Sequence, residues 1–548
     1  MTIDSPAQRN ARAMLVAVFA LVAACAGVWT LPPLDRDEAR FAQATAQMLE
    51  SGDYVTIRFQ DRERNKKPAG IHWMQAASVT AFSDVSAREI WAYRIPSLIG
   101  IVLAALFTFF AASKLYDSRT GVLAGLLLAS APVVAAEGTI AKTDGVLLAL
   151  ICLAQLAFIH IYARAQTQEK TGWRWPLTFW FAQGVGVLVK GPIAPLVAAA
   201  TGLGLLTGQQ RFSWIARMRP ILGVLLMIAM IAPWAIAIWL STDGRFFTDA
   251  IGGDMLGKVG EAQEGHVGPP LYHFALLWLL FWPAAALILP GILQAWRERG
   301  DWRARFLLSW LIPAWIIFEI AATKLSHYVV PLYPALAIIC AHAAVQPIGH
   351  AWPRKLGAII FAGVGIIAAG LIAALPLHFS DARSAWPDYA AAVFVALAAI
   401  FIASFFWRGR GFEGGVAASV LAALYAWIVM SVVLPSLSQL ALSPRISTAL
   451  EIAERHPLHD DKAPVAIVGY SEPSAVFLLG TQTALTDPRD AANSLRAGSV
   501  SAAIIEARFD DAFVTALKNH PVTALAVIDG LNYSNGKEVS LTIYVRAP

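Results

Sequence analysis

Long apolar runs alternate with short polar segments along most of the chain, and this pattern predicts a helical membrane protein. Each run is close to the roughly 20 residues that an α-helix needs to cross a bilayer. The split at Lys190-Gly191-Pro192 also fits one broken helix. The first run continues beyond Cys25 to Leu31, so we expect an uncleaved helix rather than a signal peptide. Thirteen candidate spans lie at about residues 13–31, 91–113, 121–136, 143–164, 176–190, 191–207, 219–240, 271–294, 304–322, 328–346, 355–376, 388–408 and 414–434.

One dense polar segment, Leu34 to Trp73, separates the first two apolar runs. It opens with acidic residues and ends in a basic turn over 62–68. Helical spacing places Asp37, Phe41, Ala44 and Met48 on one face, so we predict an amphipathic helix over 37–50 that lies flat on the membrane surface.

The pattern changes after about residue 440. Short apolar runs at 464–470, 501–507, 522–529 and 539–545 predict strands, and the last two, around a Ser534-Asn535-Gly536 turn, form a hairpin. Helices are expected to begin at 474–479 and to cover 510–519. We therefore expect a membrane domain over 1–440 and a small α/β domain over 441–548. The latter has no Gly-rich phosphate loop and no His/Cys set, so we expect a structural or acceptor-docking role.

Charged residues between the runs predict the orientation in the membrane. Basic residues favour the cytoplasmic side, and they recur in alternate connections. With the N-terminus in the cytoplasm, thirteen spans place the segment 32–90, which contains this polar stretch, the acidic loop 241–270 and the C-terminal domain on the periplasmic side. The cytoplasmic basic residues are then Arg9, Arg12, Lys114, Arg119, Arg164, Lys170, Arg174, Arg211, Arg217, Arg219, Arg297, Arg299, Arg303, Arg305, Arg354, Lys355, Arg408 and Arg410.

Composition supports the membrane assignment and excludes other classes. The chain of 548 residues is 57% hydrophobic and only 14% charged, against roughly 25% charged in globular domains. A net charge of +5, spread over short loops, excludes a nucleic-acid partner. The cysteines Cys25, Cys152 and Cys340 lie in separate apolar runs and indicate neither a disulfide framework nor a metal cluster.

Three carboxylates are the candidate catalytic residues. Asp37 and Glu38 follow the first span, and Asp144 opens an apolar run, where an acid is expensive unless it faces water or a partner. Helix capping is the alternative for each of them. Asp37 could act as a general base toward an acceptor hydroxyl.

Basic residues on the same side indicate an anionic ligand, because cations are otherwise disfavoured there. A phosphate at headgroup level, linked to a lipid tail in the bilayer, would satisfy them, and the cations would stabilise it as a leaving group. The basic residues on this side are Arg58, Arg62, Arg64, Lys66, Lys67, Lys190, Lys258 and Lys324. The candidate binding residues are Arg36, Arg58, Lys66, Lys67, Lys190, Lys258, His266, Lys324, His327 and Tyr328.

A set of motifs in this order resembles the bacterial aminoarabinose transferases, which are polyprenyl-phosphate-dependent glycosyltransferases of the GT-C type, related to protein O-mannosyltransferases. The motifs are RDEAR at 36–40, M-x-x-S-G-D-Y-V-T at 48–56, Lys67-Pro68 with Trp73, Lys142-Thr143-Asp144, Lys190-Gly191-Pro192 and Lys324-Leu325-Ser326-His327-Tyr328 with Pro331.

The resemblance implies a GT-C fold in the inner membrane and transfer of a sugar from an undecaprenyl-phosphate donor to a periplasmic-face acceptor, typically lipid A. It makes Asp37 the catalytic carboxylate, Asp144 a second essential acid, and Lys67 and Tyr328 contacts of the donor phosphate. Lys258 stands where relatives often carry an arginine. Toward a lipid A phosphate, which needs no base, Asp37 would orient the acceptor or stabilise an oxocarbenium-like transition state.

One motif departs from the family pattern. Relatives commonly have EKPP in the basic turn, whereas this chain has Lys66-Lys67-Pro68-Ala69. The acid that could help hold a metal is missing, which leaves His266 without that partner. We therefore predict no obligatory metal and no cofactor. The more cationic pocket leaves open whether the sugar is aminoarabinose.

Three other functions compete with lipid A modification. A protein O-glycosyltransferase would use the same donor chemistry. A transporter or flippase would place charges near the bilayer midplane and show inverted repeats, and no repeat of the 34–73 pattern is found. A membrane scaffold that presents the C-terminal domain would leave the charged residues of 34–73 unexplained.

Overall fold

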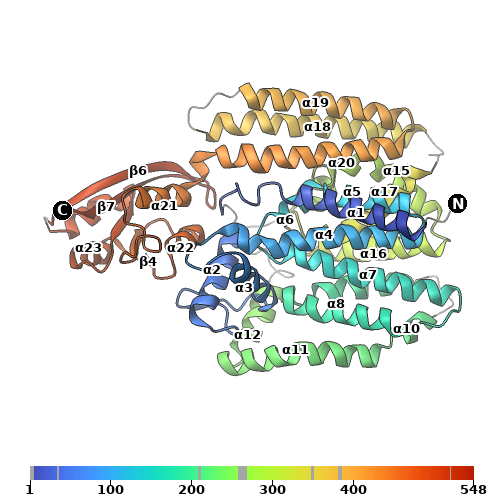
Figure 1. The fold of residues 1–548 in the computed structure, drawn as a ribbon, viewed down its shortest axis with the longest axis horizontal. Coiled ribbons are helices and arrows are strands. Elements are labelled where there is room, and N and C mark those ends of the chain that lie inside the picture. Colours follow the sequence, from blue (N-terminus) through green and yellow to red (C-terminus); the bar gives the residue numbers. More distant parts are fainter. Residues whose placement is uncertain are drawn as a thin grey trace.

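The computed structural model describes residues 5–33, 36–207, 212–256, 268–346, 351–380, 386–518 and 520–547. A bundle of long helices carries a small unit of helices and strands at one end, and the N-terminus lies at the opposite end of the bundle (Figure 1). This arrangement is the predicted helical membrane part with a C-terminal α/β unit.

Apolar helices build the bundle, and each predicted span coincides with one or two of them. By length and hydropathy, six helices of the described ranges could cross a membrane, or eight if each of two bent pairs is one span, so the number thirteen is not established. The bundle contains α1 (Pro6–Ala24), α4 (Ile90–Leu115), α5 (Ser118–Ala129), α6 (Pro132–Gly138), α7 (Asp144–Gln166), α8 (Arg174–Lys190), α9 (Ile193–Leu206), α11 (Pro220–Thr242), α14 (Tyr272–Leu280), α15 (Ala285–Arg297), α16 (Trp302–Ile320), α17 (Tyr333–Val345), α18 (Ala351–Phe379), α19 (Trp386–Trp407) and α20 (Gly411–Ile428).

Prolines break two of the predicted spans. The axis bends by 69° between α5 and α6, where Pro132 begins the second helix, and by 86° after α14, where Pro283 follows Trp282. Proline lacks the N–H that an uninterrupted helix would use, so the chain turns at these points. The split at 190–192 separates two helices, and Gly191 there adopts a φ of 70°, which favours glycine.

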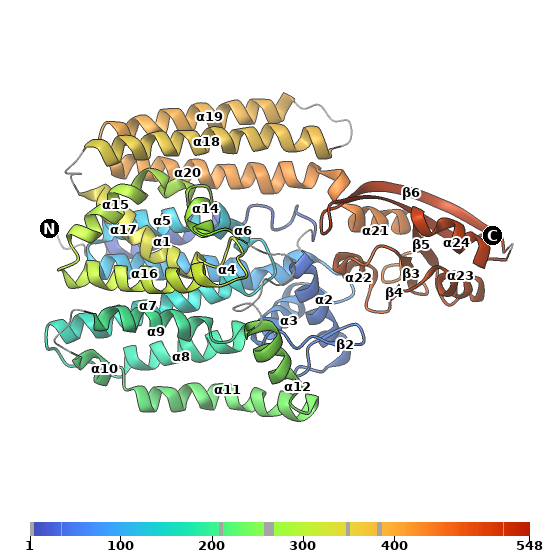
Figure 2. The same cartoon turned by 180° about the vertical axis from the view of Figure 1, so that it is seen from behind.

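The polar segment between α1 and α4 folds at the end of the bundle that faces the C-terminal unit (Figures 1 and 2). It contains α2 (Arg36–Ser51), the short antiparallel pair β1 (Arg58–Phe59) and β2 (Arg62–Glu63), and α3 (Gly70–Phe82).

The C-terminal unit is a five-stranded mixed sheet with strand order β4-β3-β5-β7-β6, in which β3 runs parallel to β4 and β5 and β7 runs antiparallel to β5 and β6. All four predicted strands and the hairpin are confirmed; β4 and α23 were not predicted. The elements are α21 (Leu442–Ile452), β3 (Val465–Val468), α22 (Pro473–Leu479), β4 (Ala484–Leu485), α23 (Pro488–Ala497), β5 (Ala502–Glu506), α24 (Asp510–Ala516), β6 (Val522–Asn532) and β7 (Lys537–Arg546).

Helices cover both faces of this sheet. Along β3, Val465 and Ile467 pack with α21 and α22, while Ala466 and Val468 pack with α23 and α24. Burial on both faces explains why β3 and β5 are continuous apolar runs rather than alternating ones.

Candidate active site

Helix α2 is enclosed between the bundle and the C-terminal unit. Phe41, Ala44 and Met48 are buried as their spacing predicts. Ala42 and Ala46 on another side pack with Val79 of α3 and with α22. The predicted amphipathic helix is confirmed, but its apolar face is covered by protein and α2 has protein on more than one side. That it lies flat on the membrane surface stays a prediction.

Asp37, in the first turn of α2, keeps an accessible carboxylate. Its side chain is 53% exposed and lies 3.2 Å from Arg40 and 3.7 Å from Arg64. The Arg64 guanidinium also lies over the Phe41 ring, 4.6 Å from its centroid, which holds it beside Asp37. Partial burial would raise the pKa of Asp37, but the charges of Arg64 and Arg40 outweigh it and hold this pKa below its ordinary value.

Asp144, the first residue of α7, is enclosed by Lys190 and His327. Lys190, the last residue of α8, places its Nζ 2.5 Å from Asp144 Oδ1, and both side chains are mostly buried. His327 Nε2 lies 4.0 Å from the same oxygen. The Asp144–Lys190 ion pair joins the first residue of α7, directly after the connection 139–143, to the last residue of α8.

The loop before α7 extends these contacts toward Asp37. Lys142 Nζ lies 3.6 Å from Glu137 Oε1, and His327 Nδ1 lies 3.9 Å from that oxygen. The charge of Lys142 acts on Asp37 as well as on His327. Burial lowers the pKa of His327 to about 3, so the imidazole is neutral at physiological pH. We call Asp37, Arg64, Glu137, Lys142, Asp144, Lys190 and His327 the charge cluster.

Known proteins share this architecture. A family model described as dolichyl-phosphate-mannose-protein mannosyltransferase matches residues 66–239. The undecaprenyl phosphate-alpha-4-amino-4-deoxy-L-arabinose arabinosyl transferase of Erwinia tasmaniensis is 28% identical over 339 residues, which are 61% of this chain and 59% of that protein. The protein of the same name from Pseudomonas aeruginosa (strain LESB58) is 26% identical over 367 residues, 64% of each chain. The chain thus spans about three fifths of the length of these curated relatives.

The crystal structure of ArnT from Cupriavidus metallidurans bound to undecaprenyl phosphate matches with a TM-score of 0.74, covering 96% of this chain and 97% of that chain at 19% identity. The resemblance to the aminoarabinose transferases is confirmed. At this identity the structural match establishes the fold, a multipass GT-C membrane protein with a small C-terminal sheet unit.

Glu38, a predicted catalytic carboxylate, is instead part of a buried ion pair. Its two oxygens accept from Arg94 Nε and Nη2 at 2.8 and 2.9 Å, and Oε1 also accepts from the Ala141 amide at 2.8 Å. The Arg94 guanidinium also donates to the carbonyls of Val28 and Leu31. A carboxylate so fully hydrogen-bonded and only 1% exposed cannot reach a substrate, so Glu38 positions α2 rather than catalyses.

The other predicted binding residues of the polar segment lie on its first helix, on β1 and in the turn before α3. Arg36 points to the C-terminal unit, 3.6 Å from Glu472. Arg58 is exposed on β1. Lys66 and Lys67 occupy the turn before α3, where Lys66 is exposed and Lys67 half-buried.

The loop before α17 brings further predicted residues to this end of the bundle. The Tyr328 ring lies edge-on to His327, with centroids 5.3 Å apart. Lys324 Nζ donates to the Gly268 carbonyl at 3.3 Å. Lys258 and His266 lie outside the described residues.

Two arginines of this region were not predicted as site residues. Arg40 is one turn after Asp37 on α2. Arg94 is fully buried in α4, and a charge within a predicted span is the signal that could have identified it, because such charges are rare unless paired.

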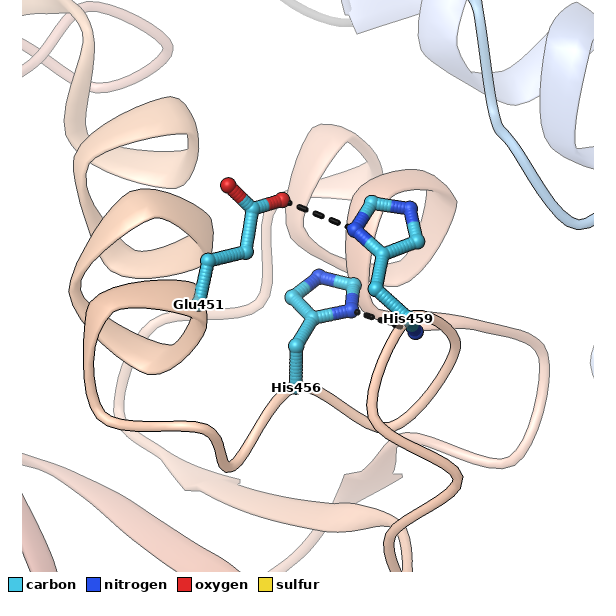
Figure 3. Close-up of side chains that lie close together, drawn as sticks. All are labelled: Glu451, His456 and His459. Carbon is cyan, nitrogen blue, oxygen red and sulfur yellow. Dashed lines mark hydrogen bonds and ion pairs between the residues drawn. The ribbon is translucent and has the colours of Figure 1, made fainter.

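A separate group of polar side chains lies in the C-terminal unit. Glu451, His456 and His459 approach one another at the end of α21 (Figure 3). The expectation that this unit has no His/Cys set is therefore wrong. The sequence did not show the cluster, because the three side chains come together only where the loop after α21 folds back.

Proposed function

We propose that this protein is an integral inner-membrane glycosyltransferase that moves a sugar from an undecaprenyl-phosphate donor to lipid A or a related envelope lipid on the periplasmic face. The charge cluster supports this proposal most directly, since one accessible carboxylate and one closed carboxylate share a group of cations at the end of the bundle. The names of the relatives supply the donor, and lipid A is the acceptor that the resemblance to the aminoarabinose transferases implies.

In this proposal, the membrane domain comprises residues 1–440 and the periplasmic domain 441–548. The α2 segment, the charge cluster and the periplasmic domain then share one side of the membrane, as the distribution of basic loops indicates.

Asp37 and Asp144 have different roles in this proposal. Asp37 is the catalytic carboxylate, because its side chain is accessible while Asp144 is closed by Lys190. Asp144 is a positioning residue that holds Lys190 and, through it, the end of α8. This assignment follows from accessibility, which a substrate needs at the reacting atoms.

Transfer breaks the bond between the anomeric carbon and the donor phosphate oxygen and forms a bond from that carbon to an acceptor oxygen. Negative charge grows on the departing phosphate, and Lys67, Lys324 and Tyr328 are proposed to bind it. A hydroxyl acceptor would give its proton to Asp37, whereas a phosphate acceptor has none to give. In the second case the Asp37 carboxylate stabilises positive charge on the sugar ring.

Lipid A from cells with and without this gene provides the test. We expect mass spectrometry of lipid A to show a sugar-sized mass that disappears on deletion and returns when the wild-type gene is supplied. Lipid A that is unchanged by deletion, in cells shown to produce the protein, would contradict this acceptor.

A protein O-glycosyltransferase is the second candidate, and the match of residues 66–239 to a protein mannosyltransferase family favours it. It predicts a loss of glycopeptides instead of a change in lipid A. Movement of a lipid-linked sugar across proteoliposomes without any acceptor would favour a flippase over both transferases.

The pH dependence of transfer is expected to be flat between about pH 5 and about pH 8. The pKa of Asp37 is below its ordinary value, so the carboxylate is lost only as the pH falls through that lowered pKa. The pKa of His327 is about 3, so its imidazole becomes charged only below this range. The initial rate of transfer by purified protein, measured across the range with a hydroxyl acceptor, checks this, because a phosphate acceptor itself titrates near about pH 6. A step near about pH 6.5 that is absent from His327→Gln would show that His327 titrates normally.

A further inference from the structure

We propose that Glu451, His456 and His459 form a binding site for a zinc-type divalent cation that stabilises the C-terminal unit. One ligand atom from each residue lies within 4.8 Å of the other two (Figure 3). The site is outside the charge cluster and does not depend on the proposed transfer reaction.

The donor set matches zinc. Two imidazoles and one carboxylate, with an open fourth position, are ligands that Zn²⁺ accepts at about 2.0–2.2 Å. Imidazole ligands also disfavour Mg²⁺ and Ca²⁺, which prefer oxygen. Tetrahedral zinc places its ligand atoms about 3.3–3.5 Å apart, so ligand atoms that lie up to 4.8 Å apart need to approach one another by roughly 1.3–1.5 Å.

The three ligand atoms can approach one another because the exposed His459 side chain can rotate, while the buried His456 side chain is held by its neighbours. His459 is 40% exposed and its Nδ1 already lies 2.9 Å from Glu451 Oε1. His456 is fully buried, and its ring stacks on that of His459 with centroids 4.2 Å apart. Rotation of the exposed imidazole can therefore close the site without disturbing the core.

Hydrogen bonds around His456 resemble the outer contacts of a metal ligand. Its Nε2 lies 3.1 Å from Ser447 Oγ, and its Nδ1 accepts long hydrogen bonds of 3.3 Å from the amides of Leu458 and His459. The His456 amide donates to Asp460 at 2.7 Å. A metal would replace one of the weak ring contacts, while the partner on the other nitrogen would keep the ring oriented.

The local electrostatics favour a cation. Glu451 lies in the last turn of α21, where the helix carries partial negative charge and a carboxylate is unfavourable. Asp460 adds a second carboxylate beside His456. A divalent cation at this point would neutralise both the side chains and the helix end.

The loop after α21, which carries His456 and His459, lies next to the surface that contacts α2. Leu458 packs against Gly480, where an added Cβ would lie 3.0 Å from Leu458 Cδ2. The next residue, Thr481, donates to Glu50 of α2 at 2.6 Å. Zinc is therefore expected to stabilise the loop that supports the contact between the C-terminal unit and α2.

The test uses the full chain in detergent with its affinity tag removed. Wild-type protein incubated with Zn²⁺ and passed through a desalting column is expected to retain one more equivalent of zinc than His459→Ala or Glu451→Gln, measured by elemental analysis. Titration against a chelator should show a loss of affinity of about 100-fold or more in either variant, because even outer contacts of a metal typically contribute 10–100-fold. Excess Mg²⁺ should not displace the zinc.

His520→Ala, elsewhere in the same unit, is the matched control and should bind zinc like the wild type. Both test variants alter half-exposed side chains, so they should fold, which a thermal melt without metal verifies. Equal zinc content in wild type and His459→Ala, or no retained zinc in wild type, would overturn the proposal.

Discussion

Replacing Asp37 with asparagine is expected to lower the rate of sugar transfer by between about 100-fold and about 10,000-fold, the range that a positioned acid or base contributes. Asparagine keeps the shape of the side chain and removes the negative charge next to Arg64. The carboxylate is 53% exposed, and Arg64 keeps its contact with the Phe41 ring, so the protein should still fold. The measurement is the initial rate with a polyprenyl-phosphate-linked sugar and a lipid acceptor, for wild type and variant at equal folded concentration.

Asp61→Asn is the matched control, since Asp61 is an exposed acid of the same polar segment outside the charge cluster. It should transfer at the wild-type rate. Asp144→Asn should also reduce transfer, because Lys190 loses its counter-ion and its position. Retained turnover in both Asp37→Asn and Asp144→Asn would contradict the proposed site and with it the transferase mechanism.

Replacing Arg94 with leucine is expected to destabilise the fold by about 3–5 kcal/mol, the cost of leaving a buried charge without its partner. Glu38 would remain in the protein interior, 1% exposed, without the guanidinium that donates to both of its oxygens. The carbonyls of Val28 and Leu31 would lose their donor as well. Thermal or denaturant unfolding in detergent, followed by loss of the monomeric peak, measures the effect.

Arg58→Ala, on the exposed strand β1, is the control and should change stability by less than about 0.5 kcal/mol. The double variant Glu38→Leu with Arg94→Leu should recover part of the loss, because no unpaired charge remains, although the carbonyls stay without a donor. Equal stability of Arg94→Leu and Arg58→Ala would show that the Glu38–Arg94 ion pair does not stabilise the packing of α2 against the bundle.

The secondary structure of the C-terminal unit could be read closely from the chain. Its strands are short apolar runs bounded by turn residues, and the Asn-Gly turn makes the last pair a hairpin. The short strand β4 and helix α23 were missed; for β4 the reason is that two residues of strand carry almost no periodic signal.

The bends in the bundle were not predicted, although Pro132 and Pro283 were visible in the sequence. A proline in an apolar run is compatible with a mild kink or a sharp break. The packing of the neighbouring helices decides between these outcomes, and here it produced angles of 69° and 86°.

Asp37 and Asp144 could be proposed from the sequence because a carboxylate at the mouth of an apolar run is costly and therefore informative. The assignment of Glu38 failed for a related reason. Neighbours in a helix point in different directions, so Asp37 faces water while Glu38 enters the core. Sequence alone could not show that Arg94, 56 residues away, would pair with it.

By itself, the sequence determined which segments become membrane helices, which become strands, and where charge is concentrated, because these properties follow from local apolar periodicity. Only the tertiary structure decided which carboxylate is exposed, which is bound by Lys190 or Arg94, and which histidines approach Glu451. The physical reason is that ion pairs in a poorly solvated interior depend on distances between residues far apart in the chain. Local patterns constrain the helices, and their packing sets those distances.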